Sequence, residues 1–164
     1  MQLDEIDLQI IQLLRQDGRM THEAISKQLG LTRPAIHKRV QKLTDSGTIQ
    51  RYKAEIDWEK LGFPLYAMIN LWVNASDFQA LFAEIKTMCT PSLYIESSER
   101  ITGQYSIVLR VRAKSTLDLT ILHDKLLATN EIKETLTSMI LQRETPEIPL
   151  TLSGDSAELA SEKI

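Results

Sequence analysis

Residues 21–47 read THEAISKQLGLTRPAIHKRVQKLTDSG, and this stretch has the pattern of two short helices joined by a tight turn. Thr21 is a suitable N-cap for the first helix because its hydroxyl can accept hydrogen bonds from the free N–H groups of the first turn. Gly30 ends that helix, and Thr32 caps the second, with Pro34 just inside it. The stretch therefore predicts a helix-turn-helix.

The second predicted helix has one apolar and one basic side. Ile36, Val40 and Leu43 follow the i, i+4, i+7 spacing of a buried stripe, and the opposite side is centred on Lys38. Between residues 22 and 54 the sequence has seven Lys and Arg against two acidic residues, a local balance of +5 in a chain of net charge −3. Positive charge concentrated on one helix pair is typical of a DNA-binding surface.

A helix-turn-helix places its second helix in the major groove, with the N-terminal residues near base edges and the flanking cations near phosphates. The candidate DNA-binding residues are Thr32, Arg33, Ala35, His37, Lys38, Arg39, Lys42, Arg51 and Lys53, with Arg33, Ala35, His37 and Lys38 as the expected base readers. Two alternatives stay open. The basic side can be an ordinary solvated face, since some helix-turn-helix proteins bind no DNA, and Arg51 and Lys53 can be solvated charges on a connecting strand.

The composition limits the class of protein. The chain has 164 residues, 43% of them hydrophobic and 25% charged, as expected for an ordinary globular protein. Its acidic net charge argues against a protein that coats nucleic acid with its whole surface, as a histone does. One cysteine, Cys89, excludes an intrachain disulfide, fits a reducing cytosol and is expected to be a small core side chain.

The sequence predicts a cytoplasmic protein without a membrane segment. The first residues, MQLDEID, lack the basic and apolar regions that are typical of a signal peptide. The longest apolar run, from Leu65 to Val73, is too short to span a bilayer.

A further helix and a short strand are expected to complete the N-terminal domain, which we assign to residues 1–54. Asp4 can cap a first helix that ends near Gly18, and three helices of this kind can bury their apolar sides against one another. The later residues 48–57, TIQRYKAEID, alternate in character, which predicts a short strand beside the second helix of the pair. The domain is therefore predicted to be a winged helix-turn-helix.

The pattern changes after a linker at residues 55–64, which contains the Gly and Pro of LGFP. Alternating segments predict strands at 65–75, 92–101, 105–113 and 132–144, and helical periodicity predicts helices at 77–89 and after a Ser115 cap. The order βαββαβ over residues 65–144 predicts a ferredoxin-like domain, so the fold class is α+β. Residues 145–164 carry one Lys against four acidic residues and are expected to form a flexible acidic tail.

Both helices of a βαββαβ unit cover one face of the sheet, so the other face is expected to be polar in a monomer. In the first strand, however, that other face carries Tyr66, Met68 and Trp72. In the last strand we assign Met139 to this same face and Leu136 to the helix side. A second semi-apolar face favours a partner sheet, most simply in a two-fold homodimer, over coverage by the DNA-binding domain or the tail.

Taken together, these motifs resemble the Lrp/AsnC, or feast/famine, transcription regulators. The resemblance covers residues 3–144 and depends on the Gly-Leu-Thr turn, the helix HKRVQKL, the segment SGTIQRY, the LG before the βαββαβ unit and the ITG in its central hairpin. It implies a winged helix-turn-helix that binds double-stranded DNA, joined to an amino-acid-responsive sheet domain. It also implies homodimers that associate into tetramers, octamers or larger rings.

In such regulators, effectors bind near the central hairpin turn, where dimers meet. The resemblance implies an effector site formed by Thr102, Gly103, Gln104, Tyr105 and Ser106, with Thr135, Thr137 and Ser138 as further candidates. Members of the family often have T-G-x-x-D in this turn, where the carboxylate suits the ammonium of an amino acid. Here Ser106 takes the acidic place, and a hydroxyl cannot supply the charge.

Three alternatives for this turn stay open. The ligand can differ from an ordinary amino acid, it can recruit Glu96 or Glu99 instead, or there is no ligand. Ordinary hairpin chemistry around Gly103 would also explain the polar residues of the turn.

No motif of the sequence supports catalysis, and no cofactor is expected. There is no P-loop, no G-x-S-x-G and no cluster of residues at metal-ligand spacing around the three histidines. The predicted function is that of a sequence-specific DNA-binding regulator modulated by a small molecule such as an amino acid. Two other classes compete with it: an architectural DNA-compacting protein without an effector, and a small-molecule binding module.

Overall fold

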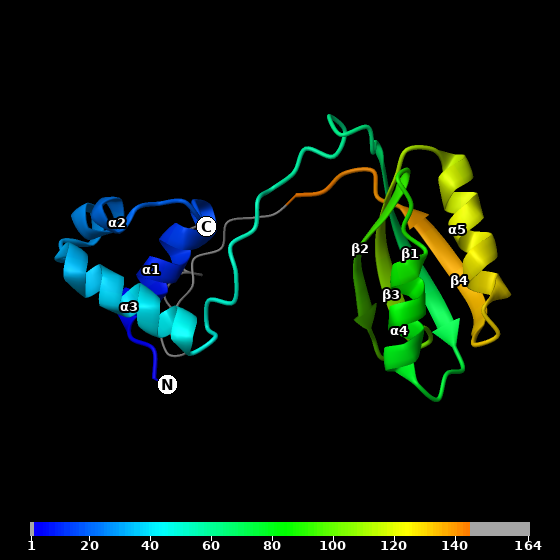
Figure 1. Ribbon diagram of the computed structural model, residues 1–164, viewed down its shortest axis with the longest axis horizontal. Helices are drawn as coiled ribbons and strands as arrows, with labels where there is room; N and C mark the ends of the chain where they lie inside the picture. The colour runs from blue at the N-terminus through cyan, green and yellow to red at the C-terminus, as the bar shows by residue number, and fades with distance from the viewer. Residues whose placement is uncertain (1, 145–164) are drawn as a thin grey trace, which may run out of the picture. The chain divides into compact units, whose positions relative to one another are not determined.

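The computed structural model describes residues 2–144, which divide into two compact units (Figure 1). The first unit ends at Glu55, and the second spans Ile56–Glu144. The acidic tail that we predict at residues 145–164 lies outside the described residues. Among the helices that are described, none combines the length and the apolar character needed to cross a membrane.

The first unit contains the three predicted helices, α1 (Glu5–Gln16), α2 (His22–Leu29) and α3 (Arg33–Asp45). The predicted caps are confirmed. Thr21 Oγ1 accepts a hydrogen bond of 3.1 Å from the Ala24 N–H, and Thr32 Oγ1 accepts one of 3.4 Å from the Ala35 N–H. Gly30 ends α2 with φ of 65°, a left-handed conformation that glycine adopts without a steric cost.

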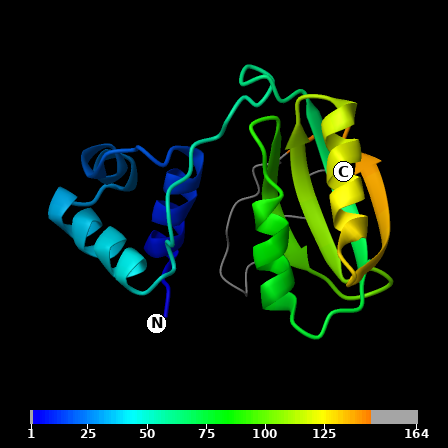
Figure 2. The same ribbon diagram turned by 45° about the vertical axis from the view of Figure 1, so that its right-hand side comes forward.

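The three helices bury one apolar side each and form a small bundle (Figure 2). Ile10 of α1, Ile25 of α2, and Ile36 and Leu43 of α3 are all fully buried. Burial of each such side chain contributes about 1.5–3 kcal/mol to the stability of the folded state. The core therefore fixes which side of α3 faces solvent.

The strand that we predict at residues 48–57 is not formed. Ile49 N–H donates to Leu43 O at 3.0 Å, and residues 50–57 then continue without regular secondary structure. A lone strand leaves its backbone groups unpaired, and this unit has no described strand that could pair with it. Tyr52 instead lies against Gly18, where an added Cβ would meet Tyr52 Cδ1 at 3.3 Å.

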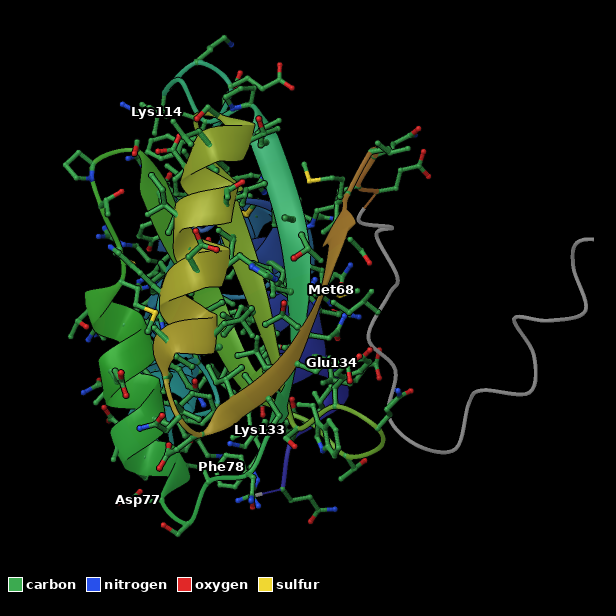
Figure 3. The ribbon with its side chains drawn as sticks, turned by 90° about the vertical axis from the view of Figure 1, so that its right-hand side faces the viewer. Met68, Asp77, Phe78, Lys114, Lys133 and Glu134 are labelled. Atoms are coloured by element: carbon green, nitrogen blue, oxygen red, sulfur yellow. The ribbon has the colours of Figure 1, made fainter. Side chains whose placement is uncertain are left out.

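The second unit is a four-stranded antiparallel sheet with two helices. Its elements are β1 (Leu65–Val73), α4 (Phe78–Thr87), β2 (Leu93–Arg100), β3 (Ile107–Ala113), α5 (Thr116–Ala128) and β4 (Ile132–Met139). The strand order is β2-β3-β1-β4, and α4 and α5 both lie on one side of the sheet (Figure 3). The predicted βαββαβ topology is therefore confirmed.

The core of this unit lies between the sheet and the two helices. Leu71 of β1 and Leu109 of β3 are fully buried there, as are Ile85 of α4 and Leu126 of α5. The predicted Ser115 cap is confirmed as a capping box, in which Ser115 and Asp118 exchange hydrogen bonds with each other's backbone. Cys89, which we expected in the core, is exposed because α4 ends before it.

The two faces of β4 are the reverse of our prediction. Leu136 pairs with Asn70, and Met139 pairs with Ala67, which is fully buried on the helix side of β1. Leu136 therefore lies on the open face of the sheet and Met139 on the helix side, because paired residues point to the same face. The register shifts by one residue next to Trp72, and a shift of one residue exchanges the faces of a strand.

Residues 56–64, which we predicted as a linker, belong to the second unit. The Trp58 ring stacks on Tyr94 of β2 with a centroid distance of 5.1 Å, and it meets the Phe63 ring edge-on at 5.9 Å. The Arg112 guanidinium lies 3.5 Å from the centroid of the Tyr66 ring and 5.6 Å from that of Trp58. These contacts cover one end of the open face of the sheet.

Candidate DNA-binding and effector sites

Helix α3 presents its basic residues to solvent. Its buried stripe is Ile36, Val40 and Leu43. The exposed candidates on the helix are Arg33, His37, Lys38 and Lys42, while Ala35 is half-buried. Thr32 is exposed, and its hydroxyl is used in the cap. The structure therefore places most of the predicted DNA-binding residues of this helix on one accessible side.

His22 is a further neighbour of this surface that was not predicted from the sequence. His22 is the first residue of α2, and its ring centroid lies 5.2 Å from that of His37 on α3. Because His22 directly follows the Thr21 cap, the sequence places it at the start of α2. The distance from His22 to α3 depends on how the two helices pack.

Arg39 differs from the other candidates, because its guanidinium pairs with two carboxylates of the first unit. Arg39 Nη1 lies 2.6 Å from Asp7 Oδ1 and 2.8 Å from Asp4 Oδ2 of the neighbouring α1 terminus. Asp7 is only 2% exposed. The Asp7 backbone N–H and the Arg39 guanidinium lower the pKa of Asp4. An arginine with two acidic partners is poorly placed to bind phosphate as well.

The remaining DNA-binding candidates, Arg51 and Lys53, are exposed on the irregular segment after α3. They line a groove with Leu14 and Arg15 of α1 and with Tyr52. Its lining combines basic side chains with the apolar Leu14 and Ile49. The missing strand therefore does not remove these cations from the surface of the first unit.

The predicted effector turn closes between β2 and β3. Ile101 N–H donates to Ser106 O at 2.9 Å, and Ser106 N–H donates to Leu71 O at 2.8 Å. Thr102, Gly103 and Gln104 are exposed, while Tyr105 and Ser106 are half-buried. The turn is thus anchored to the central strand β1 and leaves its tip accessible.

The weaker effector candidates on β4 do not share one face. Thr135 and Thr137 pair with Leu71 and Ile69 and lie on the helix side, whereas Ser138 pairs with Met68 on the open face. Alternation along a strand separates neighbouring residues in this way. The structure therefore does not bring the three residues together with the turn as one set.

The acidic residues near the turn have different partners. Glu96 Oε2 lies 3.3 Å from Arg112 Nε, and Glu99 Oε1 lies 3.5 Å from Arg110 Nε. Glu134, which was not among the predicted residues, accepts a hydrogen bond of 3.5 Å from the Tyr105 hydroxyl. Partial burial and the nearby Glu134 charge both raise the pKa of Tyr105. Over residues 2–144, no group of three or more potential metal ligands occurs.

Both units match models of one protein family. Residues 3–44 match the AsnC-type helix-turn-helix domain, and residues 93–149 match the Lrp/AsnC ligand binding domain. The HTH-type transcriptional regulator FL11 of Pyrococcus horikoshii is 33% identical over 150 residues, which cover 90% of this chain and 97% of that relative. The regulator LrpC of Bacillus subtilis is 31% identical over 140 residues, 85% of this chain and 92% of the relative.

Solved structures give the same assignment. The structure of Bacillus subtilis LrpC has a TM-score of 0.74 at 30% identity and covers 88% of this chain and 99% of its own. A transcriptional regulator of Neisseria meningitidis in complex with L-Met has a TM-score of 0.79 and covers 93% of this chain and 98% of its own. At 24% identity, the second likeness concerns the fold alone. The chain therefore belongs to the Lrp/AsnC family of transcriptional regulators.

Proposed function

We propose that this protein is a cytoplasmic regulator that binds specific operator sequences in double-stranded DNA. The observation that carries the proposal is the division of α3 into a buried apolar stripe and an exposed basic side. The stripe fixes the orientation of the helix on α1 and α2, so the basic side is free to enter a major groove. The membership of the family supports the same function.

The exposed residues divide into two roles. Arg33, His37 and Lys38 lie in the first half of α3, which is where a recognition helix contacts base edges, and the half-buried Ala35 offers a methyl group there. The other exposed candidates contact phosphates, and these are Thr32, Lys42, Arg51 and Lys53. Arg39 supports the helix from the protein side and makes no DNA contact in this proposal.

The proposed regulator acts as a homodimer that assembles further into a tetramer, an octamer or a larger ring. The open face of the sheet supports this assembly, because Trp72 is 51% exposed and Leu136 is 47% exposed on it. Large apolar side chains gathered on one face favour association with a second copy. A dimer would also offer two recognition helices for two half-sites.

The second unit is proposed to bind an amino-acid effector at the hairpin turn. The match of residues 93–149 to a ligand binding domain supports this, as does the L-Met held by the Neisseria meningitidis regulator. The contacting residues are proposed to be those of the turn, Thr102, Gly103, Gln104, Tyr105 and Ser106. Thr135, Thr137 and Ser138 of β4 stay weaker candidates, because they do not share one face of the sheet.

Selection of bound duplexes from a random pool tests the function directly. The full-length protein is expected to enrich one sequence pattern, and its affinity for that pattern should exceed its affinity for random DNA by about 1,000-fold or more. Binding to both should weaken as salt increases, because phosphate contacts release counterions. Binding without sequence preference would indicate a DNA-compacting protein, and no binding to any duplex would indicate a small-molecule binding module.

A further inference from the structure

An amino-acid effector carries an ammonium, and the turn has no carboxylate of its own with which to bind it. Ser106 occupies the position at which a carboxylate is expected, and a hydroxyl carries no charge. A buried or half-buried ammonium needs a charged partner, because its loss of water is otherwise uncompensated. The partner must therefore come from a neighbouring element.

The two acidic residues considered from the sequence are already neutralised. Glu96 is paired with Arg112 at 3.3 Å, and Arg143 Nη1 lies 4.0 Å from its other oxygen. Glu99 is paired with Arg110 at 3.5 Å and also accepts a hydrogen bond of 2.8 Å from Ser97 Oγ. A ligand ammonium would have to displace an arginine from either carboxylate.

Glu134 differs from both. It lies on β4 beside the turn (Figure 3), and its Oε1 is 3.5 Å from the Tyr105 hydroxyl. Within the described part of the chain Glu134 has no ion pair with Lys or Arg. The neighbouring Lys133 donates instead from its Nζ to Asn130 O at 2.7 Å. Trp72 is its cross-strand partner on β1, and the Trp72 side chain is 51% exposed. Glu134 is thus a carboxylate without a cationic partner in the described residues, paired across the strands with Trp72 and hydrogen-bonded to Tyr105.

We propose that Glu134 binds the ammonium of the effector, with Trp72 and Tyr105 beside it. This inference depends on the proposed amino-acid response. A carboxylate supplies the charge-assisted hydrogen bond that Ser106 cannot, and aromatic rings attract a cation held over their faces. The ligand class is therefore a free α-amino acid, and a 2-hydroxy acid of the same side chain should bind more weakly, because it lacks the ammonium.

The turn supplies groups for the other end of such a ligand. The backbone N–H groups of Gly103 and Gln104 make no hydrogen bond within residues 2–144, so they can donate to a carboxylate. Gly103 has φ of 117°, and an added Cβ there would meet no heavy atom within 4 Å. A ligand can therefore approach the backbone of the turn, and the Tyr105 hydroxyl links the turn to Glu134 on β4, one strand beyond β1.

This site overlaps the surface through which copies are proposed to associate, because Trp72 belongs to both. Trp72 lies on the open face of the sheet, two residues along β1 from Asn70, which pairs with Leu136. A ligand beside Trp72 would change the surface that a second copy contacts. Effector occupancy and assembly would then be coupled, and the coupling would act in both directions.

Calorimetric titration of the full-length protein with a panel of the twenty amino acids tests the inference. The amino acid that binds most tightly is then compared with its 2-hydroxy acid on the unmodified protein and on Glu134→Gln. We expect Glu134→Gln to weaken the amino acid at least about tenfold and to change the hydroxy acid less than about twofold. Glu99→Gln is the matched control, because Arg110 already neutralises Glu99, and it should leave both affinities unchanged.

A second variant checks that the lost affinity comes from the missing charge and not from a change in local structure. Ser106→Asp in the Glu134→Gln background restores a carboxylate at the turn and is expected to recover most of the lost affinity. Equal losses for the amino acid and the hydroxy acid, or unchanged binding in Glu134→Gln, would overturn the role of Glu134. Either result would leave the proposed amino-acid response standing. If no amino acid binds the unmodified protein while operator binding persists, the proposed amino-acid response fails, and the inference fails with it.

Discussion

The charged residues of α3 differ in what they contact. Lys38 and Lys42 are exposed, and neither forms an ion pair within residues 2–144. Arg39, next to Lys38 in the sequence, is held by two carboxylates of the first unit. One position along a helix changes the direction of a side chain by about 100°, so neighbours on α3 serve different purposes. The proposed DNA-binding role is therefore assigned to Lys38 and Lys42 and not to Arg39.

Lys38→Ala is therefore expected to weaken operator binding more than binding to random DNA. A side chain that reads a base contributes about 1–3 kcal/mol to discrimination, and only the operator offers that base. Competition titrations with both duplexes at one salt concentration measure the two losses. Lys60→Ala is the control, because Lys60 is exposed in the second unit and pairs with Asp57. Equal losses on both duplexes would make Lys38 a phosphate contact.

Asp4 makes the stability of the first unit depend on pH. Its pKa is lowered by the Asp7 N–H and by Arg39, so folding favours the charged carboxylate. Such a group contributes stability above its unfolded pKa of about 3.9, and the contribution is lost as pH falls through the lower folded pKa. Asp4→Asn keeps a capping acceptor but cannot ionise. Its melting temperature should lie furthest below that of the unmodified protein near pH 7, and the gap should narrow below pH 4. A gap that is constant with pH would contradict this role.

At the scale of elements, the contact between α1 and α3 fixes the recognition helix. The apolar core holds the two helices together, and Ile10 and Ile36 are its fully buried members on each side. Asp7 adds a directed contact, because its buried carboxylate binds one guanidinium nitrogen of Arg39 at 2.6 Å. A hydrophobic core tolerates small rotations, whereas an ion pair of this length does not. The pair is therefore expected to define the rotation of α3 about its axis.

Asp7→Ala tests this contact. We expect a loss of about 1.5–3 kcal/mol in the free energy of unfolding of the first unit, the usual contribution of a hydrogen bond to a charged group. Operator affinity should fall relative to random DNA even where the protein is fully folded, because the helix is less well oriented. Denaturant titration and DNA competition measure the two effects. Asp45→Ala, at an exposed position of α3, is the control and should change neither.

The sequence predicted most of these elements because their signals are local. The Thr21 and Thr32 caps and the Ser115–Asp118 capping box each lie within four residues, and all three are formed as predicted. The errors concern contacts that are distant in sequence. A strand after Gly47 needs a partner strand, and the face of Leu136 depends on its register against β1.

In the candidate sites, too, local features could be predicted from the sequence and contacts between distant residues could not. The exposed side of α3 could be derived from helical periodicity, because the buried stripe is read from the same thirteen residues. The ion pair of Arg39 could not, since its carboxylate partners lie 35 and 32 residues earlier in the chain. Glu134 was missed for a similar reason, because its contact with Tyr105 joins residues 29 positions apart.

At the scale of the whole molecule, the two units have separate cores and separate tasks. The core of the first unit orients α3, and the core of the second leaves one face of the sheet open. On that open face, Val108 is 6% exposed, while Trp72 and Leu136 remain about half exposed in the single chain. A regulator with one recognition helix per chain gains affinity for a two-part operator only if two chains are joined. The open face of the second unit is the surface proposed to join them.

Leu136→Glu tests this connection between assembly and DNA binding. Because Leu136 is 47% exposed, a charge there should leave the single chain folded, but it would be buried without a partner between two sheets. We expect a monomer in sedimentation, and a loss of about 100-fold or more in affinity for a two-half-site operator. Affinity for a single half-site should change little, because α3 is intact. Leu117→Glu is the matched control, since Leu117 is 66% exposed on α5, on the helix side of the sheet. If Leu136→Glu keeps the oligomeric state of the unmodified protein, copies associate through another surface. If the variant is monomeric but binds the full operator normally, the two recognition helices act independently.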